Sequence, residues 1–425
     1  MKKVMLKTTL SLAVAMASSQ LFASGFALNE QSVSGMGTGF AGRSSSADDA
    51  STVFGNPAGM ARLEGQQITG GVAAIDASTD ISDVSGRSRG SNKGDMVPFT
   101  AVPFGFYTNK LNDQWAVGFG VYAPFGLVTD YESGFQGRGF GSKSEVKVIT
   151  FQPTVSYAFN DRVSVGFGPT INRIAGTLES DLTLNALAPD TNIKIKGDDT
   201  ALGFNIGVLV QATDTTRVGL TYHSKVSYKL DGHTEVTAPA ATAAALRSNR
   251  YDASLKIDTP ESYDLSVTQD LTDAWKLYAG ATWTRWSRLK DITVKNDGVS
   301  GATGGALAPA LVGTIKEDQN WHDTWAYAVG TSYQLTKQVV LRTGLTFDQS
   351  PTNNTDRSPR IPTGDRTIFS LGLGYEVMPN MTIDLAYSYL KEEDVKVSRS
   401  NQLASYNAKY ENSANGFGLG MTYKF

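Results

Sequence analysis

The sequence predicts an all-β protein: a transmembrane, 14-stranded antiparallel β-barrel with a small N-terminal helical hatch (plug) inside the lumen. Three observations lead to this prediction. Apolar and polar residues alternate along many segments of about ten residues, the length with which a strand crosses a bilayer at a tilt. Short turns and long polar loops alternate between those segments. Finally, the 425-residue chain ends with an aromatic residue, Phe425, after one of the alternating segments.

Composition and charge restrict the function. The net charge of −3 gives no electrostatic reason to expect a nucleic-acid partner. The absence of cysteine excludes disulfides and cysteine-ligated metals. The three histidines, His223, His233 and His322, have no G-x-S-x-G context and no H-E-x-x-H spacing. We therefore expect no catalysis, no metal site and no cofactor.

Residues 1–23 have the pattern of a signal peptide. Three lysines within the first seven residues precede an apolar run over residues 10–17, and Ala23 supplies a small residue before a cleavage site. The run is shorter than the ~20 residues that a membrane-spanning helix needs. An amphipathic starting helix is the alternative. The mature chain should thus begin at Ser24 and leave the cytoplasm.

The mature chain from residue 66 to 425 contains fourteen alternating segments. In the last one, Phe417, Leu419 and Met421 alternate with Gly418 and Gly420. An apolar face toward lipid and a small or polar face toward the lumen describe a membrane barrel. The segments start near residues 66, 95, 114, 145, 163, 201, 216, 256, 275, 323, 338, 366, 381 and 416. Aromatic residues at their ends predict an interfacial girdle: Trp275, Trp283, Trp325, Tyr333, Tyr423 and Phe425.

The connections give the barrel its orientation. Short turns are expected at 109–113, 160–162, 213–215, 271–273, 336–337 and 379–380, and long loops near 80–94, 128–144, 178–199, 232–255, 288–322, 349–365 and 395–415. Bacterial outer-membrane barrels have periplasmic turns and external loops. We therefore expect the outer membrane of a Gram-negative bacterium, with both termini periplasmic. The aromatic terminus resembles the signal that the barrel assembly machinery reads.

Residues 24–65, called the hatch below, have no strand pattern. Asp48 and Asp49 suit the first turn of a short helix, and Asn56 with Pro57 reads as the N-cap and first residue of another. Fourteen strands enclose a lumen too wide for barrel side chains to fill. A compact plug inside the lumen is therefore predicted, with a periplasmic linker as the alternative.

Several motifs resemble the FadL family of outer-membrane long-chain fatty acid transporters. They occur in order along the mature chain: residues 25–35 (GFALNEQSVSG), 47–51 (ADDAS), 56–58 (NPA), 124–129 (PFGLVT), 283–287 (WTRWS), 347–351 (FDQSP) and 361–366 (IPTGDR). The resemblance implies a fourteen-stranded barrel with an N-terminal hatch. It also implies a route from an external groove to an internal pocket, and then sideways through a gap at a kink in the third strand.

Glycines in the predicted third strand are candidates for that kink. Gly118 and Gly120 face inward beside Tyr122, and glycine within a strand often marks a bulge or a close backbone approach. Accommodation of packing is the alternative. The resemblance implies that the turn formed by Asn56, Pro57 and Ala58 lies beside this strand, with Asn56 hydrogen-bonded to it.

A ligand carboxylate in an apolar pocket needs a cation, and arginine offers two parallel donors. Alternation places Arg342 and Asp348 on the lumen side of their strand, and Arg366 begins the next strand. Arg173 resembles a basic position of the family, but it shares a face with the apolar Phe167, so a bulge re-aims it or it lies above the membrane. Pairing with lumen acids is the alternative for each arginine.

Apolar candidates lie at both ends of the route. Phe26 and Leu28 could reach the pocket as part of the hatch. At the top of the third strand, the resemblance points to an apolar mouth of the external groove, formed by Pro124, Phe125 and Leu127. Trp283 and Trp286 are three residues apart, so on a strand they point to opposite faces: Trp286 is expected in the pocket wall.

Taken together, these features predict passive uptake of long-chain fatty acids or similar hydrophobic compounds. Aromatic-hydrocarbon uptake within the same family and a general porin are the alternatives. The expected partners are the hydrophobic ligand, the outer-membrane lipids and, during biogenesis, the assembly machinery. The protein should be a monomer.

Overall fold

The structure is a computed structural model that describes residues 25–184, 188–246, 248–299, 305 and 307–425. The predicted signal peptide therefore lies outside the described residues. The strands are β1 (Gln66–Gly86), β2 (Thr100–Lys110), β3 (Trp115–Asp130), β4 (Lys143–Asn160), β5 (Val163–Leu182), β6 (Thr191–Gln211), β7 (Thr216–His223), β8 (Val226–Thr237), β9 (Arg250–Thr259), β10 (Ser262–Asp270), β11 (Trp275–Thr284), β12 (Asp291–Asn296), β13 (Thr314–Asp318), β14 (Thr324–Gln334), β15 (Val339–Asp348), β16 (Arg366–Met378), β17 (Met381–Glu392), β18 (Val395–Ser400) and β19 (Ser405–Lys424).

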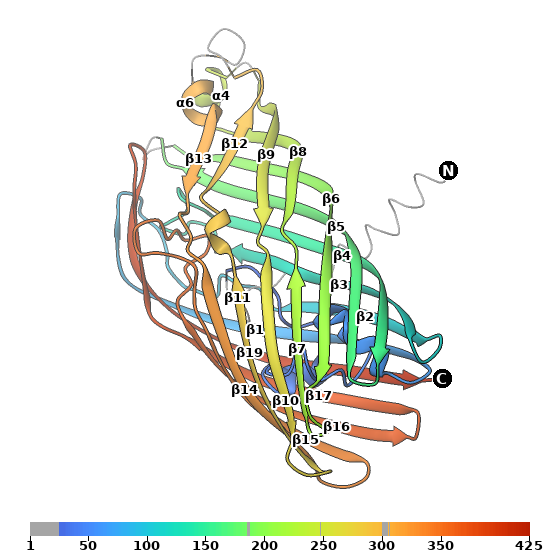
Figure 1. Cartoon of the computed structure of the whole chain (residues 1–425). Helices are drawn as coiled ribbons and strands as arrows, with labels where there is room; N and C mark the ends of the chain where they lie inside the picture. Colours follow the sequence, from blue (N-terminus) through green and yellow to red (C-terminus); the bar gives the residue numbers. More distant parts are fainter. Residues whose placement is uncertain (1–24, 185–187, 247, 300–304, 306) are drawn as a thin grey trace.

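The strands form one closed antiparallel barrel (Figure 1). Closure is direct, because β1 pairs with β2 on one side and with β19 on the other, starting at Gln67↔Lys424. Five strands of the barrel are interrupted, so that β7 and β8, β9 and β10, β11 and β12, β13 and β14, and β17 and β18 are successive parts of one strand each. The nineteen labelled strands thus make fourteen, and the predicted fold class is confirmed.

The long loops are shorter than predicted, because the strands continue beyond the membrane. β1 and β6 have 21 residues each, about twice the length that crosses a bilayer. Between β18 and β19 only residues 401–404 lie outside strands, although a loop was expected over 395–415. A polar hairpin above the membrane still satisfies its own backbone hydrogen bonds, and its side chains need no apolar pattern. Period-two hydrophobicity therefore missed these extensions.

The outward face is apolar, as predicted. In β19, Phe417, Leu419 and Met421 are exposed, whereas Cβ atoms at Gly418 and Gly420 would meet hatch Val33. Lipid takes the place of water on this face.

An aromatic row crosses adjacent strands on the outer face and reaches the long-loop end of β11 at Trp283. Its ring centroids are 4.8–6.1 Å apart along Phe167, Phe204, Tyr222, Tyr263 and Trp283. At the end with the short turns, Trp275 and Tyr333 are paired and exposed. Aromatic side chains thus mark both edges of the lipid-facing band.

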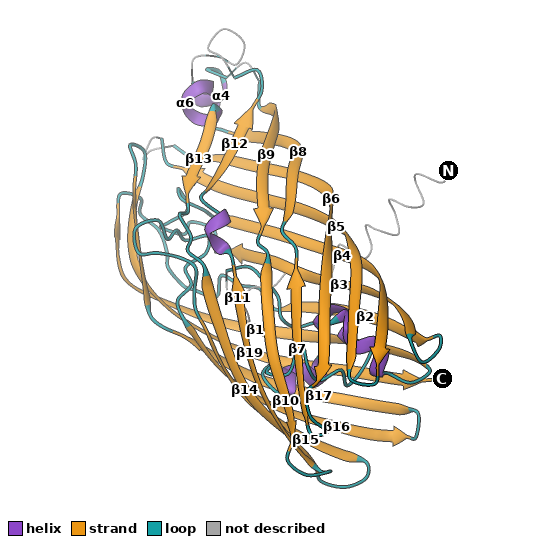
Figure 2. Cartoon of the chain, in the orientation of Figure 1, coloured by secondary structure: helices purple, strands orange, loops and turns teal. Residues whose placement is uncertain are grey.

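The hatch lies inside the barrel, close to the end where the chain terminates (Figure 2). Its helices are α2 (Val33–Gly37), α3 (Thr52–Gly55) and the 3-10 helix η1 (Pro57–Arg62); α4 (Ala240–Ala243), η2 (Trp286–Arg288) and α6 (Ala308–Val312) lie in later connections. Helix α2 contacts β15–β17 and η1 contacts β2–β6. None of the helices in the described ranges is long and apolar enough to span a bilayer.

Lumen-facing glycines let the hatch backbone touch the barrel wall. A Cβ at Gly219 would overlap Ser44, and one at Gly344 would overlap Thr38. Only glycine permits so close an approach between two backbones. The hatch consequently seals against the wall on several sides.

Candidate functional site

The third strand of the barrel contains a β-bulge. Tyr122 of β3 pairs with Thr150 and Phe125 pairs with Val148, so Ala123 and Pro124 together oppose one residue of β4. Proline cannot donate to the ladder. A bulge of this kind bends a strand and re-aims its side chains. Before the bulge Tyr122 points inward, and after it Phe125 does.

The expected kink therefore exists, but it lies three residues beyond the predicted glycines. Gly118 and Gly120 keep regular pairing with β4. A Cβ at Gly118 would meet Met60, and one at Gly120 would meet Phe106 and Val53. The prediction of a kink at these glycines is wrong; they accommodate packing.

At the bulge the barrel wall is open between β2 and β3. Their ladder ends at Gly105↔Val121, whereas β2 stays paired with β1 as far as Thr100. Beyond Val121, β3 stays paired with β4 as far as Asp130, but not with β2. This unpaired stretch, called the β2–β3 opening below, breaks the continuous hydrogen bonding expected of a closed barrel in lipid.

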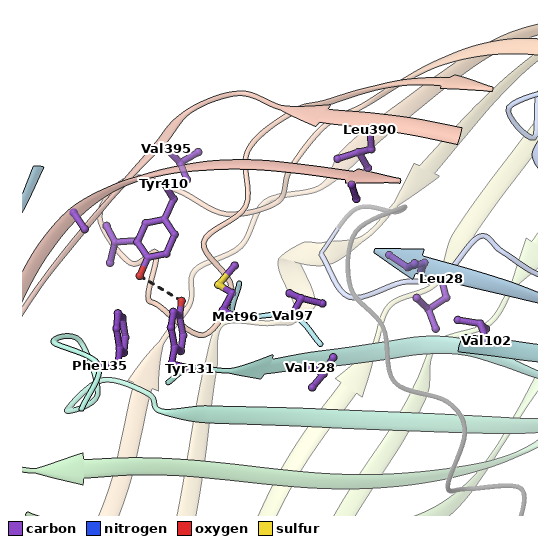
Figure 3. Packing of buried hydrophobic residues seen from close by; sticks show 14 of the residues in the cluster. Leu28, Met96, Val97, Val102, Val128, Tyr131, Phe135, Leu390, Val395 and Tyr410 are labelled. Atoms are coloured by element: carbon purple, nitrogen blue, oxygen red, sulfur yellow. Dashed lines mark hydrogen bonds between the residues drawn. The ribbon is translucent and has the colours of Figure 1, made fainter. Parts of the chain in front are cut away.

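Residues 26–28 of the hatch cover the β2–β3 opening from inside. The Leu28 amide donates to the Pro124 carbonyl (2.9 Å), and the Gly126 amide donates to the Phe26 carbonyl (2.9 Å). The Leu28 side chain packs in a buried cluster with Val102 of β2 (Figure 3). The N-terminal segment thus stands where β2 would otherwise pair with β3.

Four aromatic side chains meet above that segment and are called the aromatic partition: Phe26, Phe125, Trp286 and Trp321. The Phe26 ring lies 4.9 Å from Trp286, 5.8 Å from Phe125 and 6.0 Å from Trp321, centroid to centroid. Trp286 points inward as predicted but for another reason: β11 ends at Thr284, and Trp286 lies on the turn η2. Strand alternation does not apply to it.

An apolar external groove of about 830 Å³ lies on one side of the partition. Phe26, Leu127 and Ile361 line it, together with inner-face residues of β4, β5, β8, β9 and β12 such as Val146, Ile174, Leu230, Leu255 and Val294. Leu127 is thus placed in the groove as expected.

An internal cavity of about 690 Å³ lies on the other side of the partition, next to the β2–β3 opening. Leu28, Pro124 and Phe125 form its apolar wall. Part of its lining is polar and includes Tyr122 and Asn205: the Tyr122 hydroxyl donates to Gln152 Oε1 (2.5 Å), which also accepts from Asn205 Nδ2 (2.7 Å). Phe125 borders the internal cavity and Phe26 borders the groove. The expected placement of Pro124 and Phe125 at the mouth of the groove, and of Phe26 in the pocket, is therefore wrong, because the bulge turns Phe125 inward beside the hatch.

The predicted lumen arginines are buried and paired with acids. Arg342 Nη1 lies 2.7 Å from Asp384 Oδ1. Arg366 Nε lies 2.8 Å from Glu392 Oε1, and its Nη1 is 4.0 Å from Asp348 Oδ2. Lumen placement of Arg342 and Asp348 by alternation is confirmed, and the pairing alternative holds for both arginines.

Arg173 is not in the lumen. It stays on the outer face of β5, in unbroken register with β6, and its Nη2 lies 2.8 Å from Asp198 Oδ2. No bulge re-aims it. The assignment of Arg173 to the ligand pocket is therefore wrong.

Asn56 bonds a different strand from the one expected. Its Nδ2 donates to the Val208 carbonyl of β6 (3.0 Å) and to the Ser44 carbonyl (2.7 Å), while its Oδ1 accepts from the Ala58 amide (3.0 Å). The predicted N-cap is confirmed, and Pro57 occupies the first helical position. The expected bond from Asn56 to β3 is wrong: η1 carries it to β6.

Sequence reasoning missed Arg43, which lies in the hatch between α2 and α3. Arg43 lines the internal cavity and also a second lumen cavity of about 700 Å³, together with Glu30 and Asp348. Glu30 is 1% exposed, and burial raises its pKa to about 7, against the opposing effects of backbone N–H groups and Arg43. Alternation says nothing of side chains outside strands. Trp321 was not predicted either, because it lies in the connection between β13 and β14.

The chain matches the family model described as "Outer membrane protein transport protein (OMPP1/FadL/TodX)" over residues 14–425. It is 29% identical to the long-chain fatty acid transport protein of Escherichia coli O6:H1 strain CFT073, over 100% of this chain and 99% of that protein. A crystal structure of a Pseudomonas aeruginosa FadL homologue superposes with a TM-score of 0.85 at 27% identity, covering 95% of this chain and 100% of that one.

The Pseudomonas putida toluene transporter TodX shares the fold, with a TM-score of 0.67 at 17% identity over 93% of this chain and 99% of that one. The chain is thus an outer-membrane protein and belongs to the OMPP1/FadL/TodX family of outer membrane transport proteins.

Proposed function

We propose that this protein admits long-chain fatty acids by passive diffusion, from the external groove through the internal cavity and out sideways into the outer membrane. The observation that carries the proposal is the β2–β3 opening, which borders the internal cavity and is covered from inside by residues 26–28 of the hatch. A hydrophobic ligand that reaches the cavity has lipid as its nearest favourable environment.

The energetics agree with such a route. Each buried CH₂ contributes ~0.8 kcal/mol in an apolar site. Leu230, Leu255 and Val294 give the external groove enough apolar wall to gather an acyl chain from water. Diffusion from there into lipid is downhill and needs no energy source. The aromatic partition must move, because Phe26 and Phe125 stand between the two spaces.

The hatch argues against a general porin. Its backbone meets the wall at Gly219 and Gly344 so closely that no Cβ would fit. Sugars should therefore not pass, and liposomes carrying the protein should not swell in sugar solutions. Swelling at porin-like rates would favour the porin.

Uptake of labelled oleate tests the proposal. A host that lacks its own fatty acid transporter should gain oleate uptake and growth on oleate when it produces this protein. Toluene sensitivity is measured in parallel. If the host with this protein takes up no more oleate than the host without it, but admits more toluene, aromatic hydrocarbons would be the ligands instead.

Relatives support the fatty acid more than the hydrocarbon. The E. coli protein named for fatty acid transport is similar over its whole length. The toluene transporters support only the shared fold, at 17–18% identity.

A further inference from the structure

Two residues that line the internal cavity each have a buried nitrogen atom without a hydrogen-bond partner in the described part of the chain. Arg43 Nε of the hatch and His223 Nε2 at the end of β7 are both buried, and neither has a hydrogen-bond partner. Both residues line the internal cavity. Phe54, in helix α3 of the hatch, has its ring centroid 5.0 Å from the imidazole of His223. A buried donor without an acceptor is costly, and a ligand oxygen would remove that cost.

Arg43 differs from the other arginines of the lumen. Arg342 and Arg366 face carboxylates at 2.7 and 2.8 Å. Arg43 forms no ion pair within the described parts of the chain; its Nη2 donates to the amide oxygen of Asn29 (2.7 Å), and its guanidinium lies 5.3 Å from the ring centre of Phe40. Among the described residues, its positive charge therefore has no counter-ion at ion-pair distance.

Two acids share the lumen with Arg43. Glu30 and Asp348 line the second lumen cavity with it, but neither reaches ion-pair distance. Burial raises the pKa of Glu30 to about 7, which leaves much of it uncharged near neutral pH. The arginine thus keeps the capacity to bind an anion from the internal cavity.

We propose, on the basis of the function argued above, that Arg43 and His223 bind the carboxylate of the ligand in the internal cavity. The guanidinium supplies charge and a directed donor, and a neutral imidazole with its proton on Nε2 supplies a second hydrogen bond. The acyl chain then lies along Leu28, Pro124 and Phe125, toward the β2–β3 opening. Arg43 is in this account the residue that selects carboxylates over uncharged ligands of equal length.

Paired ligands separate charge recognition from apolar burial. Oleate and oleyl alcohol have the same chain, but only oleate is an anion. Equilibrium binding of each radiolabelled ligand is measured on purified protein in nanodiscs. In Arg43→Met, oleate affinity should fall about tenfold or more, as expected for a lost charged hydrogen bond, while oleyl alcohol affinity changes less than about twofold. Arg43→Lys should restore part of the oleate affinity.

Two further variants keep the test decisive. Arg173→Met removes the same charge from the outer face and should leave both affinities unchanged. His223→Phe retains an aromatic ring beside Phe54 and should weaken oleate about threefold to tenfold without affecting the alcohol. This variant carries the test if Arg43→Met does not give a heat-modifiable barrel.

The outcomes distinguish this inference from the proposed function. If wild-type protein binds oleate and transports it, but Arg43→Met and His223→Phe bind oleate equally well, the carboxylate site is refuted and the transport proposal survives. Equal losses for oleate and the alcohol would also refute it, since they would indicate a distorted cavity. Wild-type protein that neither binds nor transports oleate refutes the proposed function itself.

Discussion

Replacement of Asn56 by alanine should loosen the hatch from the barrel wall. The variant loses the hydrogen bonds from Asn56 to the Val208 and Ser44 carbonyls. It also loses the N-cap hydrogen bond that the Asn56 side chain accepts from the Ala58 amide. At about 1 kcal/mol for each of the two hydrogen bonds and about 1 kcal/mol for the cap, hatch opening becomes easier by about 3 kcal/mol. That corresponds to a roughly 100-fold larger open population.

Hydrogen exchange followed by mass spectrometry measures that population. Amides in a peptide covering residues 47–63 should exchange roughly 100-fold faster, while peptides from β14–β17 keep their protection. Oleate uptake should also decrease, because the same hatch carries Phe26 and Arg43 onto the cavity walls. Asn380→Ala, in a short turn, is the matched control. Exchange within threefold of wild type would refute the anchoring role of Asn56.

Three further changes have definite expected results. Arg342→Met leaves Asp384 buried and unpaired and should destabilise the barrel toward urea by about 3–5 kcal/mol, while Asp384→Asn in the same chain recovers most of the loss; a single variant as stable as wild type would contradict this. Glu30 has a folded pKa of about 7, above its unfolded value of 4.5, so the folded state binds more protons between these values and hatch stability should fall as pH rises from about 4.5 to 7. Glu30→Gln should flatten that profile in heat-modification assays, and an unchanged slope would contradict the assignment. Trp286→Ala opens the aromatic partition and should change oleate uptake without loss of the folded barrel; unchanged uptake would show that the partition does not limit passage.

Alternation predicts those parts of this protein where a strand separates lipid from lumen. There a side chain has only two directions, and one of them requires an apolar residue. Fourteen strands, the outward row of β19 and the lumen positions of Arg342 and Asp348 follow from that constraint. The constraint does not apply above the membrane, where β6 continues as a polar strand. It also does not apply outside strands, where Arg43 and Trp321 lie.

The errors in the predicted site have different physical origins. A bulge consists of one extra residue. The sequence pattern around Ala123 and Pro124 does not distinguish a strand that ends there from a strand that continues past a bulge with its side chains redirected. Gly118 attracted the prediction because glycine serves equally for bends and for close contacts. Asn56 is the N-cap of a short 3-10 helix whose direction is set by packing against the barrel wall, and strand periodicity does not report that packing. The assignment of Arg173 to the pocket was wrong for a different reason. Alternation correctly placed this side chain on the outer face, but the family resemblance suggested the pocket.

Uptake of labelled oleate by a Pro124 deletion variant tests the sideways exit most directly. Removing one residue cancels the register shift between Tyr122 and Phe125, so β3 can pair with β2 beyond Gly105 and close the wall. Pro124→Ala, which keeps the extra residue, is the control. The account predicts that the deletion variant forms a heat-modifiable barrel and still binds oleate, but transports it at the rate of cells without the protein. Wild-type uptake through a barrel closed in this way would contradict the account.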